Sequence, residues 1–456
     1  MNTTIAKRGV RTPLGVDPEN DLSAWDVTLW AREVLEIIDE NMLAQYAVNR
    51  DFEPQMQQFG ETINARLRGD FKSRRKGEYD DVEIQKLTGT TIPLVLNQLA
   101  HVSFRVTDWS KTKTFADITS EYLEPAALAL VKGINRTILG MAPFFISRNG
   151  GKLGGLTPEN ARTEILTLEA ALQTDQDWGP APCFIDTETR SILLDIEDFT
   201  SAEKIGDDGT AIRNASLGRK LGFDWLKTSN GAGQRLRLPD NTTAINLAAG
   251  YAKGTTVVAV DDGTELAVGE MANIGGKPYR VTAIATNDVT IAPGLYEFVA
   301  DDTAVTSASL TAIDGAQVTG HTKAIALDAT AYVGDILNIE HTDATIGTYT
   351  VVDVDGSDVW LDRPLDKAIA DAAAVAFWPM GSYNLALEPD AIMMASRPLP
   401  AVPPETGAKS VTVNYDGMTV RITMSYEGRG QAMLVTMDIL YGLKVLREEK
   451  GGVLFG

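Results

Sequence analysis

Few side chains in this sequence are of the kinds that catalyse reactions or bind metals. The three histidines, His101, His321 and His341, are far apart, and no HExxH or similar metal-ligand spacing occurs. Cys183 is the single cysteine, which excludes an internal disulfide and is typical of a small buried apolar residue. We therefore predict no catalytic, metal or cofactor-binding site. We expect the protein not to be an enzyme and to need no cofactor.

Carboxylates are plentiful, but none forms a recognisable catalytic pair. We interpret one group as helix caps and solvated side chains, namely Asp186, Glu188, Asp195, Glu197 and Asp198. Asp353, Asp355 and Asp358 lack the glycine and the terminal glutamate of an EF-hand, so we interpret them as turn residues.

A glycine-rich stretch at residues 148–155 contains Lys152 and invites comparison with a phosphate-binding loop. It lacks the G-x-x-x-x-G-K-[ST] spacing, and no clear strand precedes it. We predict a flexible linker at this point.

The composition indicates a globular chain with several domains. Its 456 residues are 44% hydrophobic and 23% charged, and this length exceeds a single core. No apolar run is long enough to cross a membrane, and the N-terminal residues lack a secretory signal. The net charge of −21 argues against a surface that coats nucleic acid. Residues 241–383 hold 19 acidic and 6 basic residues, which marks them as a separate, well-solvated module.

The N-terminal part of the chain predicts an extended arm, a helix and a long hairpin. Ser23 is suited to cap a helix with the apolar stripe Val27, Trp30, Val34, Ile38 and Met42. Residues 61–68 and 90–106 predict two paired strands. A two-stranded hairpin cannot bury a core of its own, so it needs a surface on which to lie.

Six basic residues mark the far end of this hairpin: Arg66, Arg68, Lys72, Arg74, Arg75 and Lys76. One interpretation is a solvated tip. The other is an arm whose charges contact an acidic surface of a neighbouring subunit, giving register more than affinity. We take these six residues and Trp30 as candidate subunit-interface residues.

A long central helix is predicted between two β-rich segments. Its apolar stripe consists of Leu123, Ala127, Leu130, Ile134, Ile138 and Met141. Pro125 suits its first turn and Gly140 its end. Thr157 and Pro158 start a second helix, and Asp186 caps a short third one. The inner face of the second helix is Ala161, Ile165, Leu168 and Leu172.

Residues 255–376 contain two copies of one unit of about 55 residues. Residues 257–261, 268–274, 279–281 and 287–291 match residues 324–328, 333–339, 349–351 and 357–361. Their short alternating segments predict two small β-barrels or sandwiches in tandem. After them, residues 390–400 predict a short helix that runs into an extended proline segment. Residues 418–424 and 432–437 predict a hairpin, and residues 442–447 the last strand.

Several short motifs resemble a known family. Residues 216–225, with the sequence SLGRKLGFDW, resemble the passage in which tailed-phage major capsid proteins cross their axial domain. Residues 383–400 resemble the re-entry into that domain in coat proteins of short-tailed Salmonella-type podoviruses, where a β domain is inserted. The C-terminal hairpin and residues 441–447 are similar to the end of the Hong Kong 97 capsid fold.

This resemblance implies an α+β fold of the Hong Kong 97 type with an inserted all-β module. The module departs from the family in being a tandem repeat. The implied parts are an N-terminal arm with its helix (1–55), an E-loop hairpin (56–108), and a peripheral domain with the spine helix (109–155 and 408–438). The others are an axial domain (156–240, 384–407 and 439–456) and the module (241–383), with repeats at 255–308 and 322–376.

The resemblance also implies a major capsid protein that self-assembles, as hexamers and pentamers, into an icosahedral shell around phage double-stranded DNA. Implied partners are a separate scaffolding protein, a portal and the packaged DNA, the last by proximity without sequence specificity, and no membrane. The implied location is the virion, assembled in the host cytoplasm. One alternative is a surface adhesin or glycan-binding protein built on tandem β repeats. A cytosolic hydrolase is disfavoured because no site for it was found.

Overall fold

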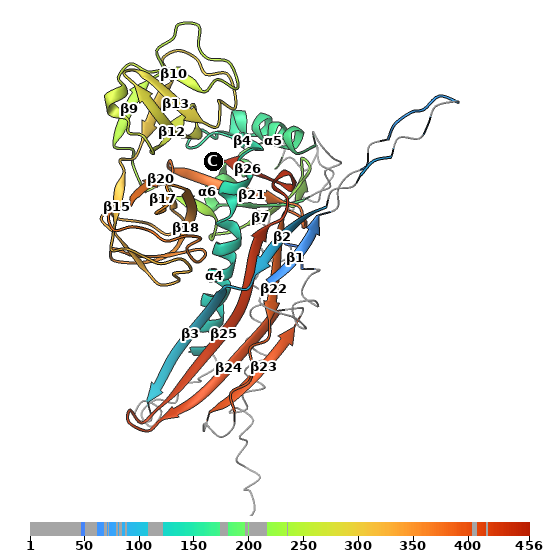
Figure 1. Cartoon of the computed structure of the whole chain (residues 1–456), viewed down its shortest axis with the longest axis vertical. Coiled ribbons are helices and arrows are strands. Elements are labelled where there is room, and N and C mark those ends of the chain that lie inside the picture. Colours follow the sequence, from blue (N-terminus) through green and yellow to red (C-terminus); the bar gives the residue numbers. More distant parts are fainter. Residues whose placement is uncertain are drawn as a thin grey trace, which may run out of the picture.

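The computed structural model describes residues 47–50, 62–67, 71, 73–78, 81, 84–86, 89–107, 122–173, 181–196, 199, 217–234, 236–403, 408–415 and 418–456 (Figure 1). The predicted N-terminal helix, including Trp30, lies outside these residues.

A long, narrow antiparallel sheet forms the elongated part of the molecule (Figure 1). Its strands are β3 (Gln98–Thr107), β22 (Ile392–Arg397), β23 (Lys409–Tyr415), β24 (Met418–Glu427) and β25 (Ala432–Val445). β25 is central, because it pairs with β3 along one side and with β24 and then β22 along the other. The predicted C-terminal hairpin is confirmed as β24 and β25.

Helix α4 (Glu124–Leu139) runs alongside this sheet (Figure 1). All six residues of the predicted apolar stripe are at most 3% exposed. They share one core with Val420, Ile422 and Val435 of the sheet. The predicted central helix is therefore confirmed, within one residue at each end.

A second sheet of seven strands joins the chain's middle and C-terminal segments. Its order is β4 (Asn149–Gly151), β26 (Gly451–Phe455), β21 (Gly381–Leu387), β5 (Ala181–Ile185), β7 (Phe223–Lys227) and β6 (Arg219–Lys220), with β8 (Ala232–Gln234) paired to β21. Helices α5 (Pro158–Gln173) and α6 (Thr187–Leu194) pack on one face. The four predicted inner-face residues of α5 are fully buried there.

The other face of this sheet belongs to the core that also contains α4. Phe184, Leu385 and Phe455 point into that core, while their neighbours Cys183, Ala386 and Leu454 point toward α5. This follows from the two-residue period of a strand. A short 3-10 helix, η4 (Ala142–Phe145), joins α4 to β4. Cys183 is buried as predicted, and burial raises the pKa of its thiol.

Residues 241–307 form a six-stranded sheet, here called unit 1. Its order is β10 (Val257–Ala259), β13 (Asp288–Ala292), β12 (Lys277–Ala285), β11 (Met271–Ile274), β14 (Ala304–Ser307) and β9 (Asn241–Ala244), and it also carries the 3-10 helix η5 (Gly263–Glu265). An isolated bridge between Ile245 and Val260 joins the two ends of this order.

Residues 311–377 form a closed barrel, here called unit 2. Its order is β16 (Ile325–Leu327), β19 (Asp358–Leu361), β18 (Ile346–Asp355), β17 (Ile336–Glu340), β20 (Ala374–Phe377) and β15 (Thr311–Asp314), with β15 closing onto β16. This order matches that of unit 1 strand for strand. The predicted tandem repeat is confirmed by this correspondence.

Each unit begins with a strand that lies outside the repeat boundaries predicted from the sequence. Thr243 and Ala244 of β9 lie opposite Val305 and Ala304 of β14. Thr311 and Ala312 of β15 occupy the same register against β20. A short shared sequence, Thr-Ala-Ile at residues 243–245 and 311–313, is the signal that extends the repeat to these strands.

Units 1 and 2 join the rest of the molecule through adjacent strands. The chain leaves the seven-stranded sheet after β8 and returns in β21, and these two strands pair through Gln234–Gly381 and Ala232–Tyr383. We call this paired crossing the neck. Unit 1 also contacts the body where the Leu153 N–H donates to the Gly276 carbonyl at 2.8 Å.

The prediction of a short helix at the start of residues 390–400 was wrong, because residues 392–397 form strand β22. The register runs from Ile392 opposite Val445 to Arg397 opposite Leu440. Residues 391–396 are all buried. A short apolar run is compatible with a helix or a buried strand, and here pairing with a distant strand decides.

The prediction of a flexible linker at residues 148–155 was also wrong, because β4 pairs in parallel with β26. Its glycines permit close contact. A Cβ at Gly150 would lie 2.4 Å from the Glu164 carbonyl oxygen, and one at Gly151, where φ is +76°, would lie 2.1 Å from that of Phe455.

The last strand is β26, and the predicted last strand at residues 442–447 is mostly the end of β25. β26 follows a short 3-10 helix, η7 (Glu448–Lys450), and all five of its residues are buried. Gly451 and Gly452 lie against Phe145 and Leu168. A glycine-led segment with only three apolar residues gives little sign of a central strand.

Candidate subunit interface

The predicted hairpin is confirmed as β1 (Thr62–Leu67) paired with β2 (Thr90–Val95). The predicted second strand divides at Leu96 and Asn97, because β2 pairs with β1 whereas β3 pairs with β25. Ala65 and Leu94 are fully buried against Met393 of β22, which anchors the base of the hairpin.

The described residues between β1 and β2 extend away from the rest of the molecule (Figure 1). Arg74, Arg75 and Lys76 lie together there, all exposed. Two large apolar side chains are exposed on the same excursion: Phe71 is 68% exposed and Ile84 is 93% exposed. Exposed apolar side chains on a projecting element are typical of a contact surface.

The remaining candidate residues are less well placed. The backbone of Arg66 lies opposite Thr91 in β1, and Arg68, Lys72 and Trp30 lie outside the described residues. The structure also adds exposed acids, Glu78 and Asp81, just after the basic group. The described residues between β1 and β2 therefore include both signs of charge as well as the exposed Phe71 and Ile84. This composition was readable in the sequence but overlooked.

The face of the long sheet opposite α4 is a second exposed surface. The register places Leu99 beside Leu440, and Arg105 beside Leu434. Leu99 is 53% exposed and Leu434 is 38% exposed. An exposed ion pair joins Arg105 to Glu427 at 3.1 Å, and a largely buried one joins Arg421 to Asp438 at 2.7 Å. The exposed part of this face therefore carries leucines and one pair of opposite charges.

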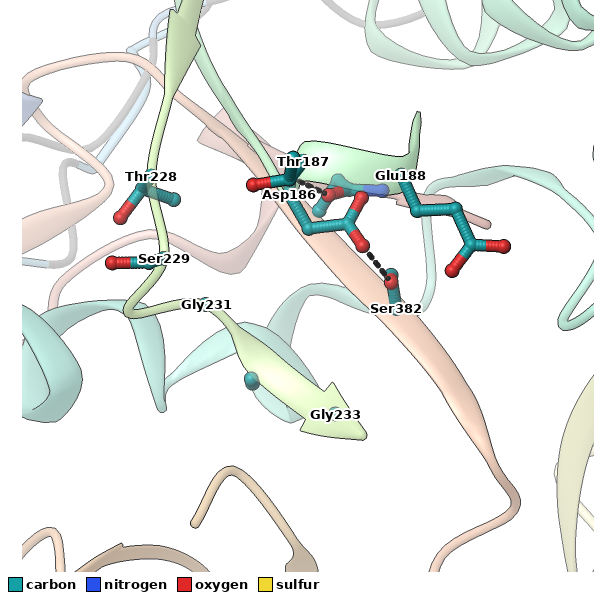
Figure 2. A pocket seen from close by; sticks show the side chains of 10 residues that line it. Asp186, Thr187, Glu188, Thr228, Ser229, Gly231, Gly233 and Ser382 are labelled. Carbon is teal, nitrogen blue, oxygen red and sulfur yellow. Dashed lines mark hydrogen bonds between the residues drawn. The ribbon is translucent and has the colours of Figure 1, made fainter. Parts of the chain in front are cut away.

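A shallow pocket of about 380 Å³ lies where α6 meets β21 (Figure 2). The Asp186 carboxylate accepts hydrogen bonds from the Thr189 N–H at 2.8 Å and from the Ser382 hydroxyl at 2.7 Å. The Asp186 N–H donates to Asn384 Oδ1 at 2.9 Å. These bonds confirm Asp186 as a helix cap and tie α6 to the sheet. No histidine or cysteine is among the described residues that line the pocket.

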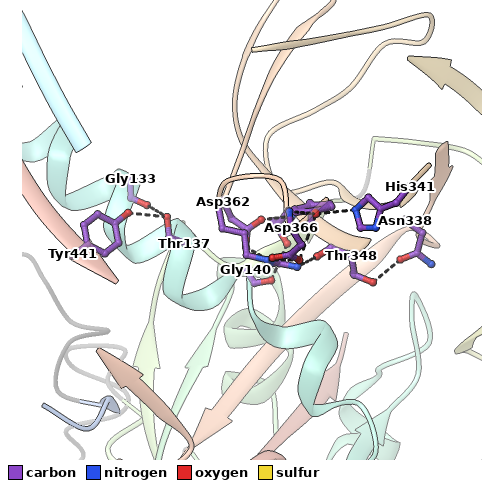
Figure 3. Close-up of polar contacts among 12 residues, drawn as sticks. Gly133, Thr137, Gly140, Asn338, His341, Thr348, Asp362, Asp366 and Tyr441 are labelled. Atoms are coloured by element: carbon purple, nitrogen blue, oxygen red, sulfur yellow. Dashed lines mark hydrogen bonds and ion pairs between the residues drawn. The ribbon is translucent and has the colours of Figure 1, made fainter. Parts of the chain in front are cut away.

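A polar network joins unit 2 to the C-terminal end of α4 (Figure 3). The Thr350 hydroxyl donates to the Gly140 carbonyl at 2.8 Å, and the Thr350 N–H donates to the Asp362 carboxylate at 2.9 Å. Arg363 pairs with Asp362 at 3.0 Å. Burial raises the pKa of Asp362, and the Arg363 guanidinium and the Thr350 N–H oppose that rise.

His341 belongs to the same unit and is 5% exposed. Its Nε2 lies 3.1 Å from the Tyr349 hydroxyl, and its Nδ1 lies 3.1 Å from the Thr345 hydroxyl (Figure 3). Burial lowers the pKa of His341, whereas the charges of Asp366 and Asp343 oppose this. Burial also raises the pKa of Tyr349 to about 12. Both ring nitrogens of His341 therefore have a hydrogen-bond partner within unit 2.

The described residues contain no group of three or more histidine, cysteine, aspartate or glutamate side chains placed to hold a metal ion. Within the same residues, no helix is long and apolar enough to cross a membrane.

No family model matches the sequence, and no curated protein matches it. Solved phage structures are similar to it along most of their length. A chain from Mycobacterium phage Che8 is 12% identical with a TM-score of 0.43, covering 91% of this chain and 90% of its own. The capsid structure of cyanophage P-SCSP1u is 10% identical with a TM-score of 0.44, covering 90% and 86%. The mature capsid of bacteriophage PhiM1 is 8% identical with a TM-score of 0.40, covering 88% and 83%.

Proposed function

We propose that this chain is the major capsid protein of a tailed phage, with a fold of the Hong Kong 97 type. The function is to build a closed shell around double-stranded DNA from many copies of the chain. The observation that carries the proposal is the β1–β2 hairpin. Two strands cannot bury a core alone, yet this hairpin extends from the body, and the segment between its strands exposes Phe71, Ile84 and charged residues.

The rest of the architecture supports this proposal. A long sheet with α4 beside it supplies a rigid elongated body. The hairpin is joined to that body where β2 of the hairpin continues into β3 of the sheet. In the proposed assignment, α4 is the spine helix, the hairpin is the E-loop, and the seven-stranded sheet is the axial domain. The neck supports units 1 and 2 as an inserted module. The proposal rests on these features of the chain itself and not on the similarity to solved phage structures.

Assembly would arise from many modest contacts multiplied by copy number. The hairpin of one subunit would lie across its neighbour, where the charges of its tip set the register and Phe71 and Ile84 supply apolar area. The acidic module, with 19 acidic and 6 basic residues, would face outward, away from DNA. A separate scaffolding protein, a portal and the packaged DNA would be the other partners, in a virion assembled in the host cytoplasm.

Electron microscopy of the purified full-length protein tests this proposal, both alone and after co-expression with its scaffolding protein. We expect polyhedral shells. The double variant Arg74→Glu with Arg75→Glu should abolish them while leaving a folded monomer, because two charges of the tip are reversed. A matched control is Lys253→Glu with Lys323→Glu, which reverses two exposed charges on units 1 and 2.

Rods, isolated knobs or featureless globules in every preparation would contradict the proposal. Binding of the monomer to glycans, without assembly, would favour the adhesin interpretation. Normal shells from the Arg74 and Arg75 variant would be consistent with a shell protein but would contradict a role of the basic tip in the subunit interface.

A further inference from the structure

Two Asn-Gly pairs occur in the chain, Asn149-Gly150 and Asn230-Gly231. An asparagine that precedes a glycine is prone to deamidation, because the glycine nitrogen has no side chain beside it to hinder its attack on the side-chain amide. The attack requires this nitrogen to approach Cγ of the asparagine, so a fold that fixes either group suppresses the reaction. The two pairs differ in how firmly the fold holds them.

The pair Asn149-Gly150 is held on both sides of the bond between its residues. Asn149 Nδ2 donates to the Ile146 carbonyl at 2.8 Å, and its Oδ1 accepts a hydrogen bond from Lys277 Nζ at 2.6 Å. Gly150 lies in β4 and is buried, and the Glu164 carbonyl oxygen is 2.4 Å from the place of a Cβ on it. The amide cannot turn toward the glycine nitrogen without breaking these contacts, so this pair reacts only when β4 opens.

The pair Asn230-Gly231 lies in the loop between β7 and β8, where the fold restrains neither reacting group (Figure 2). The Asn230 N–H donates to the Thr228 hydroxyl at 3.1 Å, which orders only the backbone before the pair. The Asn230 side chain and the Gly231 N–H form no hydrogen bond to a residue that the structure describes. Apart from the two chain neighbours, no described atom lies within 4 Å of the place of a Cβ on Gly231. The amide is therefore able to turn toward the glycine nitrogen.

We propose that Asn230 is a site of spontaneous deamidation in the folded protein. The Gly231 nitrogen bonds to Cγ of Asn230, the Cγ–Nδ2 bond breaks, and ammonia leaves with the proton that the attacking nitrogen releases. Water then opens the resulting succinimide at either of its carbonyl groups, which yields aspartate or isoaspartate. The reaction needs no reactant besides water, and mildly alkaline pH accelerates it because base removes the proton from the attacking nitrogen.

The isoaspartate product changes the backbone that holds unit 2 to the neck. In isoaspartate the main chain passes through Cβ, so it gains a carbon atom just before β8. The Gly233 N–H of β8 donates to the Gly334 carbonyl of unit 2 at 2.7 Å, and the Gly233 carbonyl oxygen lies 2.7 Å from the place of a Cβ on Gly334. Such a close contact cannot take up an added atom unchanged. We therefore expect unit 2 to be held less firmly after the conversion.

Peptide mapping of the full-length protein, kept folded at mildly alkaline pH, tests the proposal. Trypsin releases Asn230 in residues 228–235 and Asn149 in residues 149–152, because it cleaves after Arg148, Lys152, Lys227 and Arg235. Deamidation makes either peptide heavier by about 1 Da. In the folded protein Asn230 should convert about tenfold faster than Asn149, or more. In urea, where the fold restrains neither pair, the two rates should be similar.

The variant Gly231→Ala tests the role of the open loop. An alanine Cβ has space there, and Gly231 is not among the glycines with a positive φ, so the fold should be retained. The added methyl group hinders the attack, so conversion at Asn230 should slow about tenfold. Aged wild-type protein should unfold at a lower urea concentration than fresh protein, whereas aged and fresh Gly231→Ala should unfold at the same concentration.

Equal rates at Asn230 and Asn149 in the folded protein would overturn the proposal, and so would an Asn230 that stays intact while the unfolded chain is converted. Equal urea midpoints of fresh and aged wild-type protein, with Asn230 converted to isoaspartate, would overturn the effect on unit 2. This inference concerns the folded monomer and does not depend on the proposed function.

Discussion

The buried ionisable side chains of unit 2 serve as ties within the unit and to α4. Asp362 receives hydrogen bonds from the Thr350 N–H and from Arg363, and Thr350 in turn binds the end of α4. His341 is held between Thr345 and Tyr349. Buried polar groups are stabilising only while each has a partner. A change of pH that alters the charge of one of these groups should therefore change the stability of unit 2.

We predict that unit 2 loses stability as the pH falls below the ordinary value for histidine, near 6.5. Burial lowers the pKa of His341, so in this pH window the unfolded chain binds more protons than the folded one. The stabilisation is complete above the unfolded pKa and is lost as the pH falls toward the folded pKa. Urea unfolding at several pH values, followed by the fluorescence of Trp360 and Trp378, measures this effect.

The control is His341→Gln, which removes the titrating group and keeps a polar side chain. Asp343, Asp366, Lys367, Arg363 and Tyr349 surround His341 in both proteins, so their own titration is common to the comparison. The variant should be less stable above the window but should vary less with pH within it. Equal pH dependence in the two proteins would contradict the role of His341.

Only part of this residue-scale picture was predictable. Cys183 and Asp186 were assigned correctly, because burial of a lone cysteine and capping by an aspartate depend on local sequence. The contacts of Lys277 with Asn149 and of Thr350 with Gly140 join residues more than a hundred positions apart. No local pattern encodes such pairs, since they depend on how the units dock.

At the scale of elements, two glycines make a direct test of close packing. We predict that Gly133→Ala in α4 stabilises the protein by about 0.5–1 kcal/mol, because nothing lies within 4 Å of the added Cβ and alanine favours a helix. Gly150→Ala should destabilise it by about 1–3 kcal/mol, because the Cβ would lie 2.4 Å from the Glu164 carbonyl oxygen. Urea unfolding of both variants, beside wild type, gives the two signs. Equal stability of the two variants would contradict the tight contact at β4.

The neck predicts a precise boundary for removing units 1 and 2. Gln234 and Gly381 are paired across two antiparallel strands, so an Asn-Gly turn can replace residues 235–380. We expect the shortened chain to keep the helical circular dichroism of α4 and α5 and to unfold cooperatively. A cut at residues 250–378 is the comparison, and it should be less stable because it leaves β9 without β14. Loss of helix signal in the first variant would contradict a separable module.

The elements that the sequence predicted well are those with a long local pattern. α4 and α5 have unbroken apolar stripes, and units 1 and 2 repeat each other. The errors fall on short strands whose pairing is distant: β22 looked helical, β4 looked like a linker, and β26 was not recognised. In each case the partner strand, rather than the segment itself, determines the structure.

The whole molecule combines a rigid body with one projecting hairpin. The basic group of the hairpin was predicted from its charge, but the exposed Phe71 and Ile84 were not, because isolated apolar residues in a polar loop give no periodic signal. The division of the chain into capsid domains stays a prediction. The contributions of charge and of apolar contact to assembly can be measured by varying the salt concentration and by substituting Phe71 and Ile84.

We predict that assembly weakens as salt concentration rises, because exposed charges are screened over about 10 Å at 0.1 M salt. Phe71→Ser with Ile84→Ser should weaken assembly at every salt concentration, since these side chains contribute apolar area that salt does not screen. Light scattering during assembly measures both effects. Leu236→Ser with Leu238→Ser, which are 68% and 72% exposed beside unit 1, is the matched control. If neither salt nor the double substitution of Phe71 and Ile84 changes assembly, the hairpin is not part of the subunit interface.

The neck has a consequence for engineering. Two chain segments cross it as neighbouring strands, so their ends are about 5 Å apart. A foreign domain whose own termini lie that close can be spliced in at Gln234 and Gly381 in place of units 1 and 2, without lengthening or bending the sheet. The same two positions are thus a cassette site, at which each copy of the protein can carry one replaceable cargo domain.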